Sequence, residues 1–119
     1  MSVRRSYTAI VERNVRWRGQ FATEPYEAAW ASEAIFFVRA LNVLPVSTVD
    51  GGLNVGMARV QISADGIHWV DEGTRFDLPR KDNEVTFCKV THFGGWLRLR
   101  GELDAGSTIV VLVSLALKE

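Results

Sequence analysis

Two long runs of the sequence are apolar on both of their alternating sets of residues. They are EAIFFVRALNVL (33–44) and STIVVLVSLALK (107–118). Successive side chains of a β-strand point to opposite faces, so each of these strands would carry two apolar faces. A strand of an antiparallel sandwich normally carries one. We therefore expect either that both strands are central and covered twice, or that their outer faces meet another subunit.

Shorter β-rich runs fill most of the remaining sequence, and glycine-containing or polar turns separate them. The expected strands lie at 6–14, 53–63, 67–72, 74–78, 85–92 and 96–103. A helix competes over 24–44, which begins with good helix formers. A short helix or turn is left open around 25–32, and a strand is expected from about residue 34. Frequent short strands, with turn signals about every 8–12 residues, predict an all-β fold: an antiparallel β-sandwich of about eight strands, of jelly-roll or related type.

Length and charge restrict the organisation further. The 119 residues suffice for a single domain with a two-layer core. Its first residues, 1 to about 20, are interpreted as an N-terminal arm. The formal net charge is zero, which argues against a nucleic-acid partner because phosphate neutralisation needs a basic excess. Eleven of the 14 basic residues are arginines, which suit contacts between proteins.

The sequence also bears on where the chain resides. No stretch approaches the ~20 apolar residues that span a bilayer, and the N-terminus lacks the apolar stretch of a secretory signal. We expect a protein made in the cytoplasm, without a membrane partner, that a virion could still carry out of the cell. Cys88 is the single cysteine, and its strand-like surroundings are typical of a buried, inert thiol.

The common sequence patterns of catalytic and metal sites are missing. Cys88 and His92 would lie ~13 Å apart on a strand, too far for a hydrogen bond between nucleophile and base. Asp65, His68 and Asp71 lack the ligand spacing of a metal site. We therefore predict no catalytic residue, no metal ligand and no cofactor, and interpret the chain as a non-enzyme.

A polar corner occupies SADGIHW (63–69). Its D-G dipeptide favours a tight hairpin because glycine adopts the positive φ required, and Ser63 and Asp65 can bond to turn amides. Ser63, Asp65 and Gly66 are thus predicted to have a structural role, with Trp69 at the end of the sheet. The S-x-D-G-x-x-W pattern resembles a corner of discoidin-like, galactose-binding-like domains, and its spacing differs from the Asp-box of sialidases. This resemblance implies a jelly-roll or galactose-binding-like sandwich.

A second resemblance covers roughly residues 55–118. The corner and a strand are followed by FGGWLRLRG (93–101) and by an apolar C-terminal strand that ends in lysine. This order resembles small β-sandwich accessory or decoration proteins of phage-like particles. The resemblance implies a self-assembling subunit that associates with a larger protein particle and has no catalytic residue.

One group of aromatic and basic residues precedes the predicted strands of the second half. Trp17 lies between Arg16 and Arg18. Tryptophan and arginine are both enriched where proteins meet. Trp17 is therefore predicted to anchor a contact between subunits.

A second group, Trp96, Arg98 and Arg100, falls on one face of its strand. It could form a cation–π ladder, an interface or a ligand-binding face, and we favour the interface. The expected protein is thus a non-enzymatic, self-associating structural subunit, such as a particle or capsid decoration protein, in a homo-oligomer such as a trimer. The alternative is a carbohydrate-binding module that holds a glycan on exposed tryptophans, such as Trp69 and Trp96.

Overall fold

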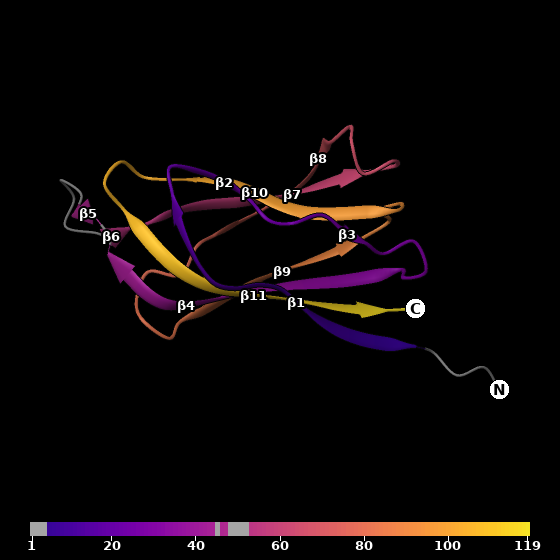
Figure 1. Cartoon of the computed structure of the whole chain (residues 1–119), viewed down its shortest axis with the longest axis horizontal. Coiled ribbons are helices and arrows are strands. Elements are labelled where there is room, and N and C mark those ends of the chain that lie inside the picture. Colours follow the sequence, from indigo (N-terminus) through magenta and orange to yellow (C-terminus); the bar gives the residue numbers. More distant parts are fainter. Residues whose placement is uncertain (1–4, 45, 48–52) are drawn as a thin grey trace.

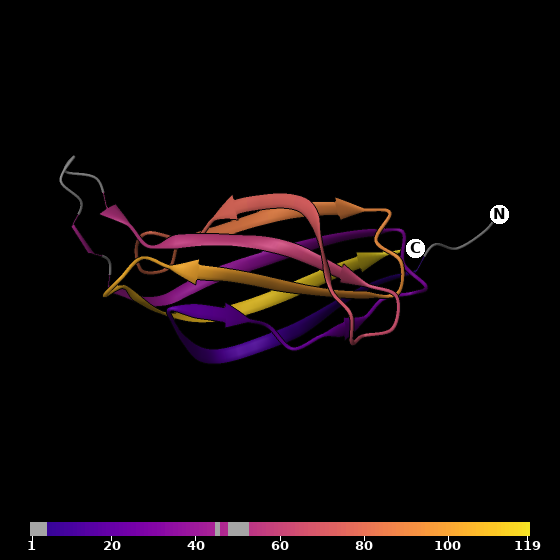
Figure 2. The same cartoon turned by 90° about the horizontal axis from the view of Figure 1, so that it is seen from above.

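Antiparallel pairing of the alternating strands builds two layers. The computed structural model describes residues 5–44, 46–47 and 53–119. Figure 1 shows two sheets lying one above the other, and Figure 2 shows from above that their long strands run along the molecule. Every strand pair in the described residues is antiparallel. The predicted all-β, antiparallel sandwich is confirmed.

The lower layer in Figure 1, which we call the β4/β11 sheet, has four strands in the order β1-β11-β4-β9. Their bounds are β1 Ser6–Arg18, β4 Glu33–Leu44, β9 Val85–Thr91 and β11 Thr108–Lys118. Residues 6–18, which belong to the predicted N-terminal arm, thus form an edge strand that pairs with β11. The two central strands are the two long apolar runs of the sequence.

The upper layer, which we call the β7/β10 sheet, has five strands, ordered β2-β10-β7-β8 with β3 also paired to β10. Their bounds are β2 Gln20–Ala22, β3 Tyr26–Glu27, β7 Gly56–Ser63, β8 Val70–Asp77 and β10 Trp96–Leu103. A separate two-stranded ribbon consists of β5 Val46–Ser47 and β6 Leu53–Asn54. Figure 1 shows this ribbon at one end of the molecule.

The core lies between the layers and follows from strand alternation. On β11, every second residue from 109 to 117 is 0% exposed. Two of these, Val113 and Leu115, lie opposite Val38 and Phe36 of β4. Buried residues of β10 pack into the same core from the other layer. Burial of each large apolar side chain contributes about 1.5–3 kcal/mol, so these strands supply much of the stability.

β4 and β11 are apolar on both faces, and the outer face is covered differently from the inner one. Within the described residues, no element lies over the outer face of the β4/β11 sheet (Figure 1). Side chains such as Ile35, Phe37 and Leu112 are therefore only half-buried there. The described part of the chain thus covers one face of these two strands and leaves the other without a second layer. A contact with another subunit stays a prediction.

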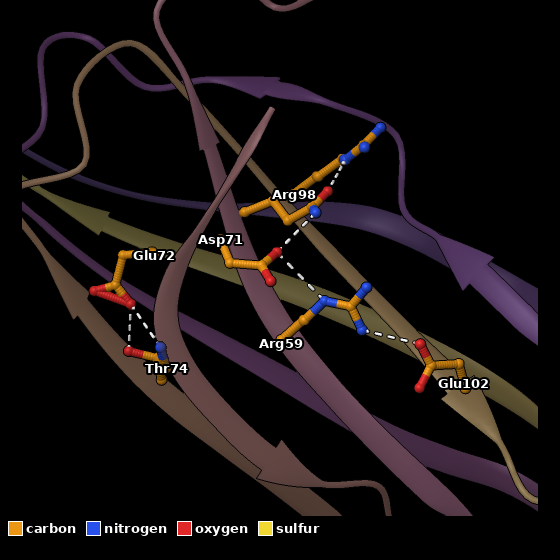
Figure 3. A network of polar contacts seen from close by, with 7 residues as sticks. Arg59, Asp71, Glu72, Thr74, Arg98 and Glu102 are labelled. Carbon is orange, nitrogen blue, oxygen red and sulfur yellow. Dashed lines mark hydrogen bonds and ion pairs between the residues drawn. The ribbon is translucent and has the colours of Figure 1, made fainter. Parts of the chain in front are cut away.

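One local prediction needs correction, and one alternative that the sequence left open is decided. Residues 67–72 and 74–78 are not two strands, because β8 runs unbroken through Gly73, which adopts φ 116°. The pairing with β7 shifts at this point, and Oε1 of Glu72 accepts a hydrogen bond from the amide of Thr74 at 2.9 Å (Figure 3). Over 25–32, where a short helix or a turn was left open, the chain forms the short strand β3 and a turn. No helix long and apolar enough to cross a membrane occurs in the described residues.

Gly101 lies where β10 closely approaches its neighbours. A Cβ atom there would lie 2.1 Å from the carbonyl oxygen of Met57 and 2.8 Å from the ring of Phe21. The β10 backbone cannot withdraw without disturbing its pairing with β7, in which Gly101 lies opposite Ala58. A residue without a side chain is therefore required at this position.

Replacing Gly101 with alanine is expected to lower the free energy of unfolding by about 1–3 kcal/mol, because the added methyl group overpacks the site. Gly95→Ala is the matched control: its Cβ would meet nothing closer than the carbonyl oxygen of Ala64 at 3.6 Å, so we expect a change below about 0.5 kcal/mol. Urea unfolding of both variants measures the difference. Equal stability would contradict the close approach described.

Candidate functional site

The outward face of the β7/β10 sheet carries the tryptophan–arginine row that the sequence predicts. Leu97 and Leu99 are buried in the core, so the alternate residues Trp96, Arg98 and Arg100 lie on the outer face, where each is half-buried. The structure therefore places all three on one surface, as the sequence alternation indicates. It also surrounds them with residues from neighbouring strands.

A chain of hydrogen bonds crosses three strands on this face (Figure 3). Arg98 Nε donates to Gln61 Oε1 at 2.8 Å, and Gln61 Nε2 donates to Asp71 Oδ1 at 2.9 Å. Arg59 Nε donates to the same Asp71 oxygen at 3.3 Å, while its Nη1 donates to Glu102 Oε1 at 3.1 Å. The network fixes the side chains of β7, β8 and β10 relative to one another.

The network also shifts the ionisation of its members. The hydrogen bond from Gln61, together with the charges of Arg59 and Arg75, holds the pKa of Asp71 below its ordinary value. Burial lowers the pKa of Arg98, and the neighbouring charge of Arg100 adds to this effect. Asp71 is therefore ionised at neutral pH, which suits its role as an acceptor from Gln61 and Arg59.

Trp69 joins this face through a contact with Arg98. The guanidinium carbon of Arg98 lies 4.3 Å from the centre of the Trp69 ring, within the range of a cation–π interaction. Trp69 is half-buried. One ring face is thus engaged by Arg98, and the same arginine connects the tryptophan to the polar network.

The corner before Trp69 is held by its own side chains. Ser63 Oγ accepts hydrogen bonds from the amides of Asp65 and Gly66 at 3.2 and 2.8 Å. Asp65 Oδ1 accepts from the amides of Ile67 and His68 at 2.8 and 2.9 Å. These contacts support the structural role predicted for Ser63 and Asp65.

Gly66 has two reasons to be glycine. Its φ is 80°, and a Cβ atom would lie 3.1 Å from the ring of Trp96. The corner therefore rests on Trp96 of β10. It is wider than the tight hairpin expected, since residues 64–69 separate β7 from β8. The additional residues allow Asp65 to bind two successive amides.

Trp17 does not lie where its predicted interface role requires. Its side chain is 4% exposed and belongs to the core. It stacks on Phe21, with ring centres 3.8 Å apart and planes 9° from parallel. The sequence interpretation of Trp17 as an interface anchor is therefore wrong for this chain. Arg16 and Arg18 are exposed on the edge strand β1.

A mainly apolar row crosses all four strands on the outer face of the β4/β11 sheet. The strand register places Ile10, Ser114, Phe37 and Phe87 in one row from β1 to β9. The rings of Phe37 and Phe87 lie 6.1 Å apart. Ile10 is 44% exposed and Phe87 52% exposed. We call this row and its apolar neighbours, Ile35, Val85, Val110, Leu112 and Ala116, the apolar face.

Catalytic chemistry finds little support in the geometry. Burial raises the pKa of the Cys88 thiol to about 12, so the thiolate that acts as a nucleophile would be scarce at neutral pH. Among the described residues, no group of three or more His, Cys, Asp and Glu side chains could hold a metal ion. Asp65, His68 and Asp71 therefore do not form such a group.

Replacing Asp65 with asparagine is expected to destabilise the protein at neutral pH. The bonds from His68 and Ile67 hold the pKa of Asp65 below its ordinary value of 3.8, so its ionised form stabilises the fold. That contribution is complete above the ordinary value and is lost as the pH falls through the lower folded value. Asparagine retains an oxygen acceptor but no charge. The stability difference between Asp65→Asn and the parent should therefore shrink with acidification.

Thermal unfolding midpoints of both proteins between about pH 7 and pH 2 measure this effect. Asp104→Asn, in another exposed turn, is the control for removing a carboxylate. A difference that stays constant over the whole pH range would show that the charge of Asp65 does not stabilise the corner.

No protein-family model matches the sequence, and a comparison with curated proteins also finds no match. Solved structures do share the fold. The VP2 subviral particle of infectious bursal disease virus matches with a TM-score of 0.55 and 15% identity, over 97% of this chain and 32% of that chain. A structure of the Gx strain of the virus matches with a TM-score of 0.50 and 11% identity, over 98% and 32%.

A family 35 carbohydrate binding module from Clostridium thermocellum matches with a TM-score of 0.41 and 12% identity, over 97% of this chain and 98% of that chain. The chain spans about a third of the length of the viral chains it matches. At these identities, the likeness to the viral chains is one of fold alone.

Proposed function

We propose that the chain is a non-enzymatic, self-associating structural subunit, of the kind that builds or decorates a particle. The observation that carries this proposal is the apolar face, whose central row contains Ile10, Phe37 and Phe87. Exposed apolar patches on soluble proteins mark contacts with other proteins. The fold likeness to a viral particle protein is consistent with such a role.

A second copy of the chain is the partner that the apolar face fits best. Sheets pack face to face about 10 Å apart, with interdigitated side chains, so two such faces can cover each other. A net charge of zero also means that two copies do not repel each other through their overall charge.

Two opposite charges on β4 favour the same partner. Glu33 and Arg39 lie on the outer face, three residues before and three residues after residue 36. A two-fold axis between Ile35 and Phe37 would place Glu33 against Arg39 of the partner subunit, in a self-complementary contact. It would also place Ile35 against Phe37 of the partner subunit. The contact proposed is therefore apolar at its centre and charge-paired at its rim.

Replacing Phe87 with arginine is expected to weaken self-association by about 30-fold or more, because it buries an unpaired charge in place of an apolar anchor. Val70→Arg is the matched control, since Val70 is 60% exposed and belongs to the β7/β10 sheet. Sedimentation velocity at micromolar concentration should show an assembly for the parent and for Val70→Arg. A parent protein that sediments as a 13.3 kDa monomer would overturn the proposal.

The geometry of the contact has its own test. Glu33→Arg and Arg39→Glu should each weaken self-association by about tenfold, because each places like charges together. The double variant should recover most of the affinity. A two-fold contact pairs copies of the chain, whereas the trimer expected from the sequence would need a head-to-tail contact instead. The measured mass decides between the two. Additive losses in the double variant would contradict the pairing of Glu33 with Arg39.

Carbohydrate binding is the second candidate function. It is favoured by the half-buried Trp69 and Trp96 beside the polar network of the β7/β10 sheet. Aromatic rings together with fixed hydrogen-bonding groups suit a sugar ring. Loss of glycan binding in a folded Trp69→Ala variant would support this candidate, and a parent protein that binds no glycan would remove it.

A further inference from the structure

Three arginines lie side by side on the outer face of the β7/β10 sheet. The strand register places Arg100 of β10 opposite Arg59 of β7, and Arg59 opposite Arg75 of β8. Neighbouring strands are about 4.8 Å apart, and like charges directly opposite each other destabilise a sheet. We call these residues the arginine row. Its arrangement costs stability unless something negative compensates for it.

Within the described residues, only the middle arginine of the row forms ion pairs, although the charge of Arg75 also acts on Asp71. Arg59 forms ion pairs with Asp71 and Glu102 at 3.3 and 3.1 Å. In the described part of the chain, neither Arg75 nor Arg100 forms an ion pair or a side-chain hydrogen bond. Two guanidinium groups therefore remain available, one on either side of Arg59 and two strand spacings apart.

A hollow opens at the arginine row. Its volume is about 240 Å³, and it is lined by Met57, Ala58, Arg59, Arg75 and Glu102. A water molecule in the liquid takes up about 30 Å³, so the hollow has room for a group much larger than one water. One of the two unpaired arginines thus borders a space that a ligand can enter.

The carboxylates within the row favour a ligand that also donates hydrogen bonds. Asp71 uses Oδ1, and Glu102 uses Oε1, to accept from the protein. Each carboxylate has a second oxygen that can accept a hydrogen bond from a hydroxyl group. A ligand with both anionic groups and hydroxyl groups matches this surface. A uniformly negative nucleic acid would instead be repelled by the two carboxylates.

We infer that the arginine row binds an acidic polysaccharide, with carboxylate or sulfate groups on Arg75 and Arg100 and sugar hydroxyls on Asp71 and Glu102. Arginine recognises both anions with paired N–H donors. Successive anionic sugars supply the repeated charges that two separated guanidinium groups require. The arginine row and the apolar face are on opposite sheets, so this inference is independent of self-association. It rests on the second candidate function and names the class of its ligand.

Affinity electrophoresis of the folded protein tests the inference. The probes are polygalacturonate for carboxylate, dextran sulfate for sulfate, unmodified dextran as the neutral control, and duplex DNA. We expect one or both acidic polysaccharides to retard the protein, more weakly as salt increases, and neither dextran nor DNA to do so comparably. Comparison of the two acidic probes identifies the anion that the site prefers.

The variant Arg75→Gln with Arg100→Gln should weaken retardation by the preferred polysaccharide about tenfold or more. It should keep or gain thermal stability, because it removes like charges from a sheet. Arg16→Gln with Arg18→Gln removes the same charge from the opposite sheet and should leave retardation unchanged. Equal weakening by both double variants would show binding to overall charge and would overturn the inference.

The remaining outcomes are also distinct. If dextran retards the protein as strongly as the acidic polymers do, glycan binding is supported but the acidic ligand is overturned. Stronger retardation by DNA would overturn the polysaccharide class. A parent protein that no probe retards would remove both this inference and the second candidate function, without bearing on self-association.

Discussion

The close packing of two apolar sheet faces is the constraint on which the remaining structure depends. Leu115 of β11 and Phe36 of β4 are opposite each other and fully buried. Because side chains alternate along a strand, fixing this inner face also decides which residues point outward. A shift of one residue in register would exchange the core with the surface. The two outer faces of the molecule are therefore consequences of the core.

The two outer faces differ in chemistry, although both result from the same alternation of side chains along the strands. The β4/β11 sheet presents phenylalanine and aliphatic side chains, whereas the β7/β10 sheet presents arginines, carboxylates and an amide linked by hydrogen bonds. Water solvates the second face well and the first poorly. A two-sided molecule of this kind can associate through one sheet while the other stays accessible to a ligand.

The sequence predicts the parts of the structure that depend on local pattern. Strand 96–103 was predicted at the bounds observed, because its polar and apolar residues alternate. The strand expected from about residue 34 begins at Glu33. The outward placement of Arg98 and Arg100 follows from the same alternation. The corner residues Ser63 and Asp65 were also identified, since their bonds join near neighbours.

Features that depend on the pairing of distant strands could not be predicted. Arg59 and Asp71 join the network of Arg98 only through the register of β7, β8 and β10. Alternation could have placed Arg59 and Gln61 on one face of their strand, but not beside β10. Trp17 was misjudged for a similar reason. Its arginine neighbours suggested a surface, while strand alternation places them outward and the ring between them inward.

The stack of Trp17 on Phe21 has a consequence for the way copies of the chain can join. Trp17 belongs to β1 in one layer and Phe21 to β2 in the other, so the pair connects the two layers across the end of an edge strand. Edge strands are the elements most readily exchanged between identical chains. Removing β1 for such an exchange would pull a tryptophan out of the core and leave a void against Phe21. For the self-association proposed above, docking of fully folded subunits is thereby favoured over strand swapping.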